Sequence, residues 1–246
     1  MASVRSEDFS VQERFTHPHL AGLHTVQQLD DGRTLASCSA SDAVLVCDLN
    51  EGSAQCFRMP ANLYGQNYSL TPEKDLRRHY IPDEYQTTHI NAASADQTGR
   101  RVVVSTLIQG AIGIFDVQSG EYAEVSRGHV GCHGARFDCS GRIYFADSTR
   151  GGLVFLNERG AEDRRVEVGS FWLHDVCQLY GAVYAFSLAD LNELRICDID
   201  REELLFQRRF PTIPIADSAP VPAGPAEWLG NSTQALSYTA LADAGR

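Results

Sequence analysis

The 246-residue chain lacks the marks of several broad protein classes. No run approaches the roughly 18 apolar residues of a membrane-spanning helix, and residues 1–8 have no apolar core of the kind found in signal peptides. Basic residues are few, since 21 Lys and Arg stand against 32 Asp and Glu and leave a net charge of −11. We therefore expect a cytoplasmic protein without nucleic-acid or membrane partners.

Several catalytic motifs are also missing. The chain has no G-x-S-x-G, no G-x-x-x-x-G-K-[ST], no H-E-x-x-H, and no Rossmann or zinc-finger pattern. These absences argue against serine hydrolases, nucleoside triphosphatases and metalloproteases of the common kinds. The seven cysteines are odd in number and contain no C-x-x-C pair, so we expect buried, reduced thiols rather than a disulfide framework.

The chain does contain an internal repeat of four segments. Each segment begins with a histidine, passes through an Asp/Gly turn and ends on Asp or Asn, over residues 24–48, 89–116, 133–157 and 174–198. The histidine precedes the closing residue by 24, 27, 24 and 24 positions, and the turn glycine by 8, 10, 8 and 7. A period of about 40 to 45 residues with four short strands is typical of a propeller blade. The repeat predicts an all-β fold, a small β-propeller.

The repeat also predicts the domain organisation. We expect a single propeller domain over residues 1–246, with five blades, four or six being the alternatives. An insertion at about 61–88 forms a loop or a lid, and residues 211–246 form a degraded last blade or a tail. One further period places Asp217 at the fifth-blade position. The segment Phe9–Phe15 is a candidate strand that closes the ring by pairing with the last blade.

One stretch carries a family resemblance. Residues 134–148, from inner strand through turn to second strand, resemble propellers of the NHL and gluconolactonase-like kind. The resemblance extends over roughly residues 20–215 and implies the fold. Because that fold hosts many unrelated activities, it leaves the function to be argued from the site.

A candidate metal site follows from the repeat. The first strand of each blade lines the central channel of a propeller, so equivalent residues converge on the axis. We predict that a divalent metal, Fe(II) favoured and Zn or another ion as alternatives, is bound by four histidines: His24, His89, His133 and His174. A metal-free polar channel, in which one histidine acts as a base, is the competing interpretation.

Other residues are candidates for roles around this ring. His129 lies four positions before His133, and Tyr80 lies in the insertion that leads into His89, so both are candidate catalytic residues. Tyr85 and Trp172 are candidates for the substrate pocket. Each of these roles has a purely structural alternative. For the insertion it is a solvated loop, and for Trp172 it is packing between blades.

Three functions are open at this point. Carotenoid-cleaving dioxygenases hold ferrous iron at a propeller axis with four histidines; the chain is similar in that arrangement and lacks their surrounding motifs, which implies a non-haem iron oxygenase. Streptogramin-linearising lyases are similar in repeat style, which implies a metal-assisted lyase, cyclase or hydrolase. The third is a non-catalytic interaction scaffold with a structural metal. We favour a metalloenzyme acting on a small organic molecule.

Overall fold

The computed structural model describes residues 2–4, 11–65, 75–76, 81–82 and 85–211. Within these ranges the chain is almost entirely β-structure. The strands are β1 Ala2–Val4, β2 Val11–Arg14, β3 Leu23–Gln28, β4 Thr34–Cys38, β5 Ala43–Asp48, β6 Ser53–Arg58, β7 Ile90–Ala95, β8 Arg101–Thr106, β9 Ala111–Asp116, β10 Tyr122–Arg127, β11 Cys132–Phe137, β12 Ile143–Asp147, β13 Gly152–Leu156, β14 Glu162–Glu167, β15 Leu173–Tyr180, β16 Val183–Leu188, β17 Glu193–Asp198 and β18 Glu203–Arg209. A short α-helix, α1 Ala61–Tyr64, follows β6, and 3-10 turns lie at Ser39–Ser41 and Ser148–Arg150.

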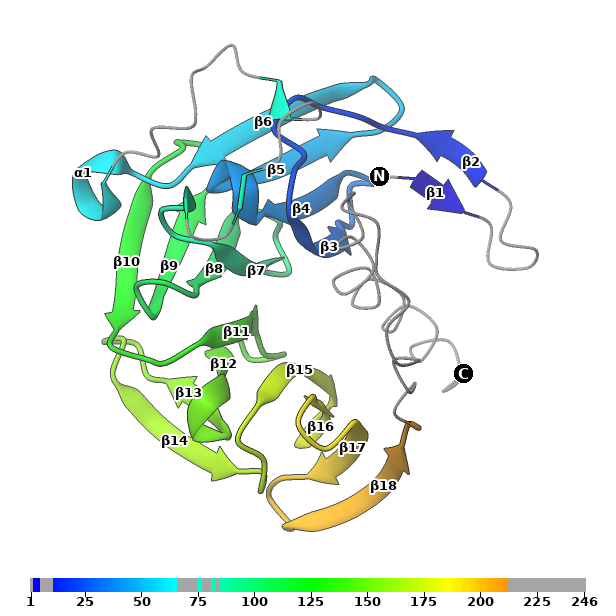
Figure 1. The fold of residues 1–246 in the computed structure, drawn as a ribbon, viewed down its shortest axis with the longest axis vertical. Coiled ribbons are helices and arrows are strands. Elements are labelled where there is room, and N and C mark those ends of the chain that lie inside the picture. The colour runs from blue at the N-terminus through cyan, green and yellow to red at the C-terminus, as the bar shows by residue number, and fades with distance from the viewer. Residues whose placement is uncertain (1, 5–10, 66–74, 77–80, 83–84, 212–246) are drawn as a thin grey trace, which may run out of the picture.

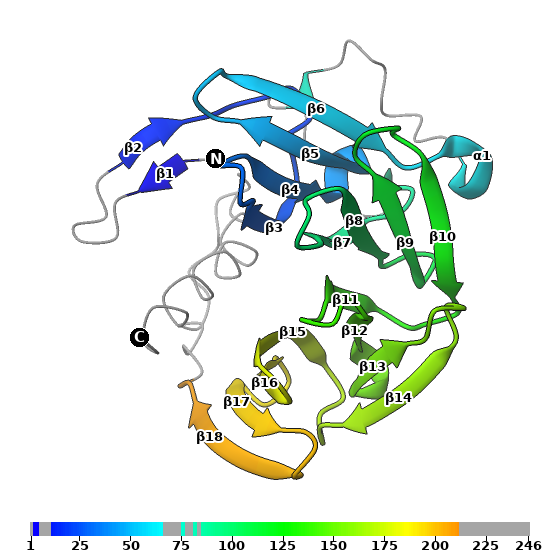
Figure 2. The ribbon, with the colours of Figure 1, turned by 180° about the vertical axis from the view of Figure 1, so that it is seen from behind.

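The strands form four antiparallel four-stranded sheets, each built in chain order from an inner to an outer strand. Figure 1 shows them as consecutive blades, with β3, β7, β11 and β15 toward the centre and β6, β10, β14 and β18 at the perimeter. The predicted all-β propeller is therefore confirmed, with four blades in the described part of the chain. These four form an arc, as both views show (Figure 2). Asp217 and the rest of 212–246, on which the fifth blade depends, lie outside the described residues.

The turn glycines predicted from the repeat are where a hairpin needs them. Gly32, Gly99, Gly141 and Gly181 follow the four inner strands, with φ of 86°, 69°, 82° and 48°. A positive φ is accessible to glycine without the clash that a Cβ atom creates. In two of these turns an aspartate at the strand end, Asp96 or Asp138, accepts backbone N–H groups of the turn. The Asp-x-x-Gly pattern thus sets the first hairpin of a blade.

Most of the apolar core lies between neighbouring blades, and a further cluster, which includes Phe15, Ala36 and Leu45, lies on the first blade. A first cluster joins β4–β6 of the first blade to β7–β9 of the second and includes Phe57, Ile90 and Phe115. A second joins the second and third blades, and a third, with Tyr144 and Tyr184 fully buried, joins the third and fourth. Because each sheet must bury both faces against its neighbours, the blades stack side by side and bring their inner strands to a common axis.

Two predictions about the chain's irregular segments meet the structure only in part. The segment Phe9–Phe15 contains strand β2, as expected, and β2 pairs with β1 in a two-stranded sheet. The predicted last blade depends on residues 212–246, which lie outside the described residues, so the pairing of this segment with that blade stays a prediction. In the insertion, α1 packs through Tyr64, whose hydroxyl bonds to Tyr122 and to Glu124. Residues 66–74, 77–80 and 83–84 of the insertion lie outside the described part of the chain, so the lid stays a prediction.

All seven cysteines are described, and none forms a disulfide. Burial raises the pKa of the Cys47 thiol to about 11 and that of Cys132 to about 12, so both are protonated near neutral pH. They pack as small apolar side chains. In the described ranges no helix is long and apolar enough to cross a membrane.

Candidate functional site

The start of each inner strand carries one structurally equivalent position. Leu23, Ile90, Cys132 and Leu173 each pair with the last residue of the second strand of their blade: Cys38, Thr106, Asp147 and Leu188. The next residues are therefore equivalent, and they are His24, Asn91, His133 and His174. In all four blades the pairing is irregular at this position or directly after it. Irregularities of this kind bend a strand and re-aim its side chains, often beside functional sites.

His89 does not occupy that position, so the predicted ring of four equivalent histidines is corrected to three histidines and Asn91. His89 lies two residues earlier and is equivalent to Gly22 and Gly131, which have φ of 63° and 66°. His89 itself has φ of 50°. A non-glycine residue in this left-handed region is unfavourable and persists only where its surroundings hold it.

Asp42 of the first blade holds His89 there. Its Oδ1 accepts the backbone N–H groups of Thr88 at 2.8 Å and His89 at 3.0 Å, and also the Thr88 hydroxyl at 2.5 Å. Its Oδ2 accepts the N–H of Thr87 at 3.0 Å. Asp42 is buried, with 5% of its surface exposed, so these bonds form in a region of low dielectric. These four hydrogen bonds, which we call the Asp42 clamp, fix the backbone directly before the first strand of the second blade.

The four histidines lie close together at this end of the axis, in two contacting pairs. The ring centres of His24 and His89 are 4.9 Å apart, and those of His133 and His174 are 4.8 Å apart. His89 and His133 are buried, whereas His24 and His174 are partly exposed. Trp172 lies beside the second pair, with its ring centre 6.0 Å from that of His133. Its predicted role in a substrate pocket stays a prediction.

The tautomer of His133 follows from its hydrogen bonds. Its Nδ1 lies 2.7 Å from the carbonyl oxygen of Gly131 and 2.8 Å from Oγ of Ser148. A carbonyl oxygen only accepts, so Nδ1 carries the proton and Nε2 keeps its lone pair. This is the arrangement that outer hydrogen bonds impose on metal-binding histidines.

The cluster holds its imidazoles neutral. Burial, followed by repulsion from His89, His133 and His174, lowers the pKa of His24 to about 3. Burial and the nearby His174 lower the pKa of His133 to about 4. Burial also lowers the pKa of His174, against an opposing effect of Asp175. Near neutral pH these three rings offer lone pairs and repel added protons.

A partly buried ion pair lies next to the histidines. Arg136 of β11 donates to Asp175 of β15 at 2.7 Å and also to the backbone carbonyl of Val176. Asp175 directly follows His174, and Arg136 lies three residues after His133, so the pair ties the third blade to the fourth beneath the imidazoles. Burial disfavours the ionised form of Asp175, but the charge of Arg136 lowers the pKa of Asp175, so the carboxylate stays ionised.

The donor set fits a metal in part. Within the part of the chain that the structure describes, no group of three or more His, Cys, Asp or Glu is placed to hold a metal ion. Each histidine pair alone has a ring separation that is compatible with a shared metal ion. With metal–nitrogen distances of about 2.1 Å, two imidazoles on the same ion have ring centres roughly 5 Å apart. The nitrogen donors at this end of the axis are the four imidazoles, arranged as two contacting pairs.

The remaining predicted site residues have other surroundings. His129 packs its ring 4.5 Å from that of Phe145, and its Nε2 lies 2.9 Å from Oγ of Ser126, so the structure sets it between blades. Tyr85 is 64% exposed. Tyr80 lies outside the described residues. The roles predicted for these three residues stay predictions.

Asn91 is the residue that reasoning from the sequence missed, although the spacing carried a signal. Counted from His89, the turn glycine lies 10 residues on, against 8, 8 and 7 in the other blades. Counted from Asn91, the interval to Gly99 is 8. The longer interval of the second blade therefore marked a histidine placed two residues ahead of the equivalent position.

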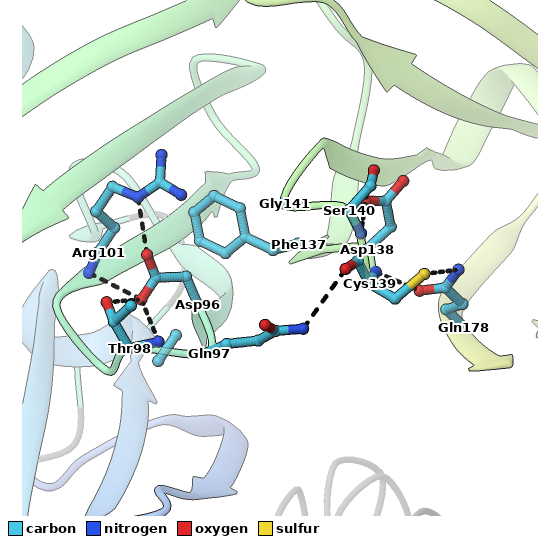
Figure 3. A pocket seen from close by; sticks show the side chains of 11 residues that line it. Asp96, Gln97, Thr98, Arg101, Phe137, Asp138, Cys139, Ser140, Gly141 and Gln178 are labelled. Carbon is cyan, nitrogen blue, oxygen red and sulfur yellow. Dashed lines mark hydrogen bonds and ion pairs between the residues drawn. The ribbon is translucent and has the colours of Figure 1, made fainter. Parts of the chain in front are cut away.

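A hollow lies at the opposite end of the inner strands. It has a volume of about 310 Å³ and is lined by the turns after β7 and β11, together with Gln178 (Figure 3). Asp96 bonds to Arg101 and Thr98 there, and Asp138 to Ser140 and Arg142. Both carboxylates are therefore committed to their own turns.

Comparison with known proteins supports the fold. No family model and no curated protein matches the chain. Among solved structures it is similar to virginiamycin B lyase from Staphylococcus aureus (10% identity, 84% of this chain and 62% of that one, TM-score 0.58). It is also similar to a streptogramin B lyase (13%, 82% and 59%, TM-score 0.57) and to the WD40 repeats of RRP9 (12%, 83% and 55%, TM-score 0.60). The chain spans less than two thirds of each of them.

Proposed function

We propose that this chain is a metal-dependent enzyme of the lyase class, acting on a small organic molecule at the histidine end of the propeller axis. The observation that carries the proposal is the convergence there of His24, His133 and His174 from one equivalent position in three blades. The fold likeness to two lyases supports the reaction class. A divalent ion in such a site supplies a Lewis acid that polarises a carbonyl or a leaving group.

The chain's own residues have separable roles in this proposal. His133 is oriented by the Gly131 carbonyl and Ser148, which keeps its Nε2 lone pair available. Trp172 lies beside His133, where it is placed to contact a bound molecule. The Arg136–Asp175 pair holds the third and fourth blades in register beneath them, so that His133 and His174 keep their separation.

The metal is the first property to measure. The untagged protein is stripped with a chelator, dialysed, reconstituted with iron or zinc under anaerobic conditions, and analysed for metal content. We expect about one equivalent per chain. His24→Ala and His174→Ala, at partly exposed positions, are expected to lose most of it. His129→Ala serves as the matched control and is expected to retain it, because His129 contacts Phe145 and Ser126 instead. Full metal content in both cluster variants contradicts the proposal.

The identity of the metal distinguishes the lyase from the iron oxygenase. Tight binding of zinc with substrate turnover in the absence of O₂ supports the lyase. A requirement for Fe(II) and O₂ consumption with substrate supports a non-haem iron oxygenase acting at the same site.

A non-catalytic scaffold is the second candidate, and one observation favours it. Strand β18 and the residue that follows it expose Leu204, Leu205, Phe206 and Phe210, and the fold is also similar to the WD40 repeats of RRP9. Exposed apolar surface of this kind is typical of protein contacts. A protein that binds no metal, yet whose β18 surface is protected from hydrogen exchange by a partner, supports this function instead.

A further inference from the structure

The outer strand of the fourth blade differs from the other three outer strands in where its apolar side chains lie. In β6, β10 and β14 the larger apolar side chains pack in the clusters between neighbouring blades, as is the case for Phe57, Tyr122, Val125 and Val166. In β18, Leu204, Leu205 and Phe206 are 51%, 45% and 44% exposed. This strand lies at the end of the arc, where no other described blade covers it (Figure 1).

The strand pairings show which side chains of β18 point away from the third blade. Cys197 of β17 packs in the cluster between the third and fourth blades, so Ile196, its neighbour in the strand, points to the opposite face. Paired residues share a face, so Phe206, the partner of Ile196, points the same way. Two charged residues of β18 lie on this face on either side of Phe206: Glu203, which pairs with Asp198, and Arg208, which pairs with Leu194.

An exposed patch occupies the outer half of this face. Phe206 lies at its centre, beside the half-buried Leu194 and Ile196 of β17. Val183 and Ala185, on the inner half of the same face, are buried, which confines the patch to the two outer strands. Along β18 the patch therefore presents an acidic, an aromatic and a basic side chain in that order. Such a pattern is complementary to a copy of itself that runs in the opposite direction.

We propose that a second copy of this chain packs on this patch across a two-fold axis perpendicular to the strands. The two β18 strands then run antiparallel, Phe206 contacts Phe206 of the second copy near the axis, and Glu203 of each copy lies opposite Arg208 of the other. A two-fold interface uses the same patch on both partners, so one self-complementary pattern serves both. Opposite charges across an interface fix its register. The inference is independent of the metal proposed at the histidine end.

The charges favour a second copy over the segment that follows β18. Residues 212–246 contain Arg246 as their single basic residue. That segment can therefore place a basic side chain opposite Glu203 only through its last residue. A second copy supplies both an arginine for Glu203 and a glutamate for Arg208, at matching distances from Phe206.

Sedimentation velocity of the full-length protein, over a wide range of protein concentrations, tests the association. A patch on two strands is at the small end of stable interfaces, so we expect a Kd on the order of micromolar. Phe206→Asp places a charge beside the axis and is expected to weaken the dimer at least about a hundredfold. Ile108→Asp is the matched control, because Ile108 is also an exposed apolar residue but lies on the second blade. It is expected to stay within about threefold of wild type.

A mixing experiment tests the register. Glu203→Arg and Arg208→Glu each place like charges opposite one another, so each variant alone is expected to associate at least about tenfold more weakly than wild type. Mixed in equal amounts, the two variants restore both opposite-charge pairs. We expect them to form a heterodimer within about threefold of the wild-type affinity.

Three results would overturn the inference. The first is a wild-type protein that stays monomeric up to about a hundred times the expected Kd. If Phe206→Asp is then less stable to urea than wild type while Ile108→Asp is not, residues 212–246 are the occupant of the patch instead. The second is a dimer that survives Phe206→Asp unchanged. The third is a mixture of the two charge variants that associates no better than either one alone. Circular dichroism of each variant shows whether a loss of association reflects unfolding.

Discussion

The hydrogen bonds from residues 87–89 to Asp42 lead to a specific prediction about stability. Asp42→Gly removes the carboxylate while keeping a residue that adopts the left-handed φ of 46° found at this position. It leaves the N–H groups of Thr88 and His89 and the Thr88 hydroxyl without their acceptor, in a buried place. The N–H of Thr87 loses its acceptor as well.

The expected magnitude follows from these contacts. A buried donor that loses its partner costs roughly 1–3 kcal/mol, and such effects do not add fully within one network. We expect Asp42→Gly to lower the free energy of unfolding by roughly 3–6 kcal/mol, a large part of the 5–15 kcal/mol typical of a domain. Asp42→Asn keeps the oxygen that accepts three of the four bonds, so we expect a loss of roughly 1–2 kcal/mol. Asp42→Ala adds about 1 kcal/mol of backbone strain to the effect of glycine.

Urea unfolding followed by circular dichroism measures these differences. Asp200→Gly is the matched control, because the Asp200 side chain is 64% exposed and its ion pair with Arg164 lies at the surface. We expect the control to change the free energy of unfolding by less than about 1 kcal/mol. If Asp42→Gly falls within that same range, or if Asp42→Asn is as damaging as Asp42→Gly, the reasoning from the clamp is wrong.

Two further predictions test the neighbourhood of the histidines. At Gly134, with φ of 58°, a Cβ atom would lie 2.3 Å from Oδ1 of Asp175, so Gly134→Ala is expected to lower the unfolding free energy by roughly 2–4 kcal/mol. Gly32→Ala, with φ of 86° and open space around it, should lose about 1 kcal/mol, and equal losses would refute the clash. The second prediction concerns pH. In the folded protein the pKa values of His24 and His133 are about 3 and 4, below the ordinary 6.5. Between the folded-state pKa of each ring and 6.5, the unfolded chain therefore binds more protons than the folded one. Their stabilising contribution is therefore complete above about pH 6.5 and falls as the pH drops toward 4, by up to about 1.4 kcal/mol per pH unit for each ring. Urea unfolding of the metal-stripped protein at pH 7.0, 5.5 and 4.5 checks this; His24→Ala should flatten the profile, and a wild-type profile that is already flat contradicts it.

The fold and much of the site could be predicted from local pattern. A blade consists of about 40 consecutive residues. Interactions within one blade therefore determine the alternation of apolar residues, the Asp/Gly turns and the period of the repeat. Gly32, Gly99, Gly141 and Gly181 were predicted as turns for this reason and have the positive φ that the turns require. The placing of histidines at the start of the inner strands likewise follows from the repeat.

The membership of the ring was decided by tertiary structure. Asn91 and His89 differ by two positions. The spacing to the turn glycine gives a hint, and the pairing of β7 with β8, with its irregularity at Asn91, establishes which of them is equivalent to His24. The left-handed backbone of His89 depends on Asp42, a residue of a different blade and 47 positions away in the sequence. The contact between His24 and His89 depends on the packing of two sheets. A sequence repeat predicts the structure that forms within each blade. Contacts between neighbouring blades form only when the sheets pack together, so a local sequence pattern does not predict them.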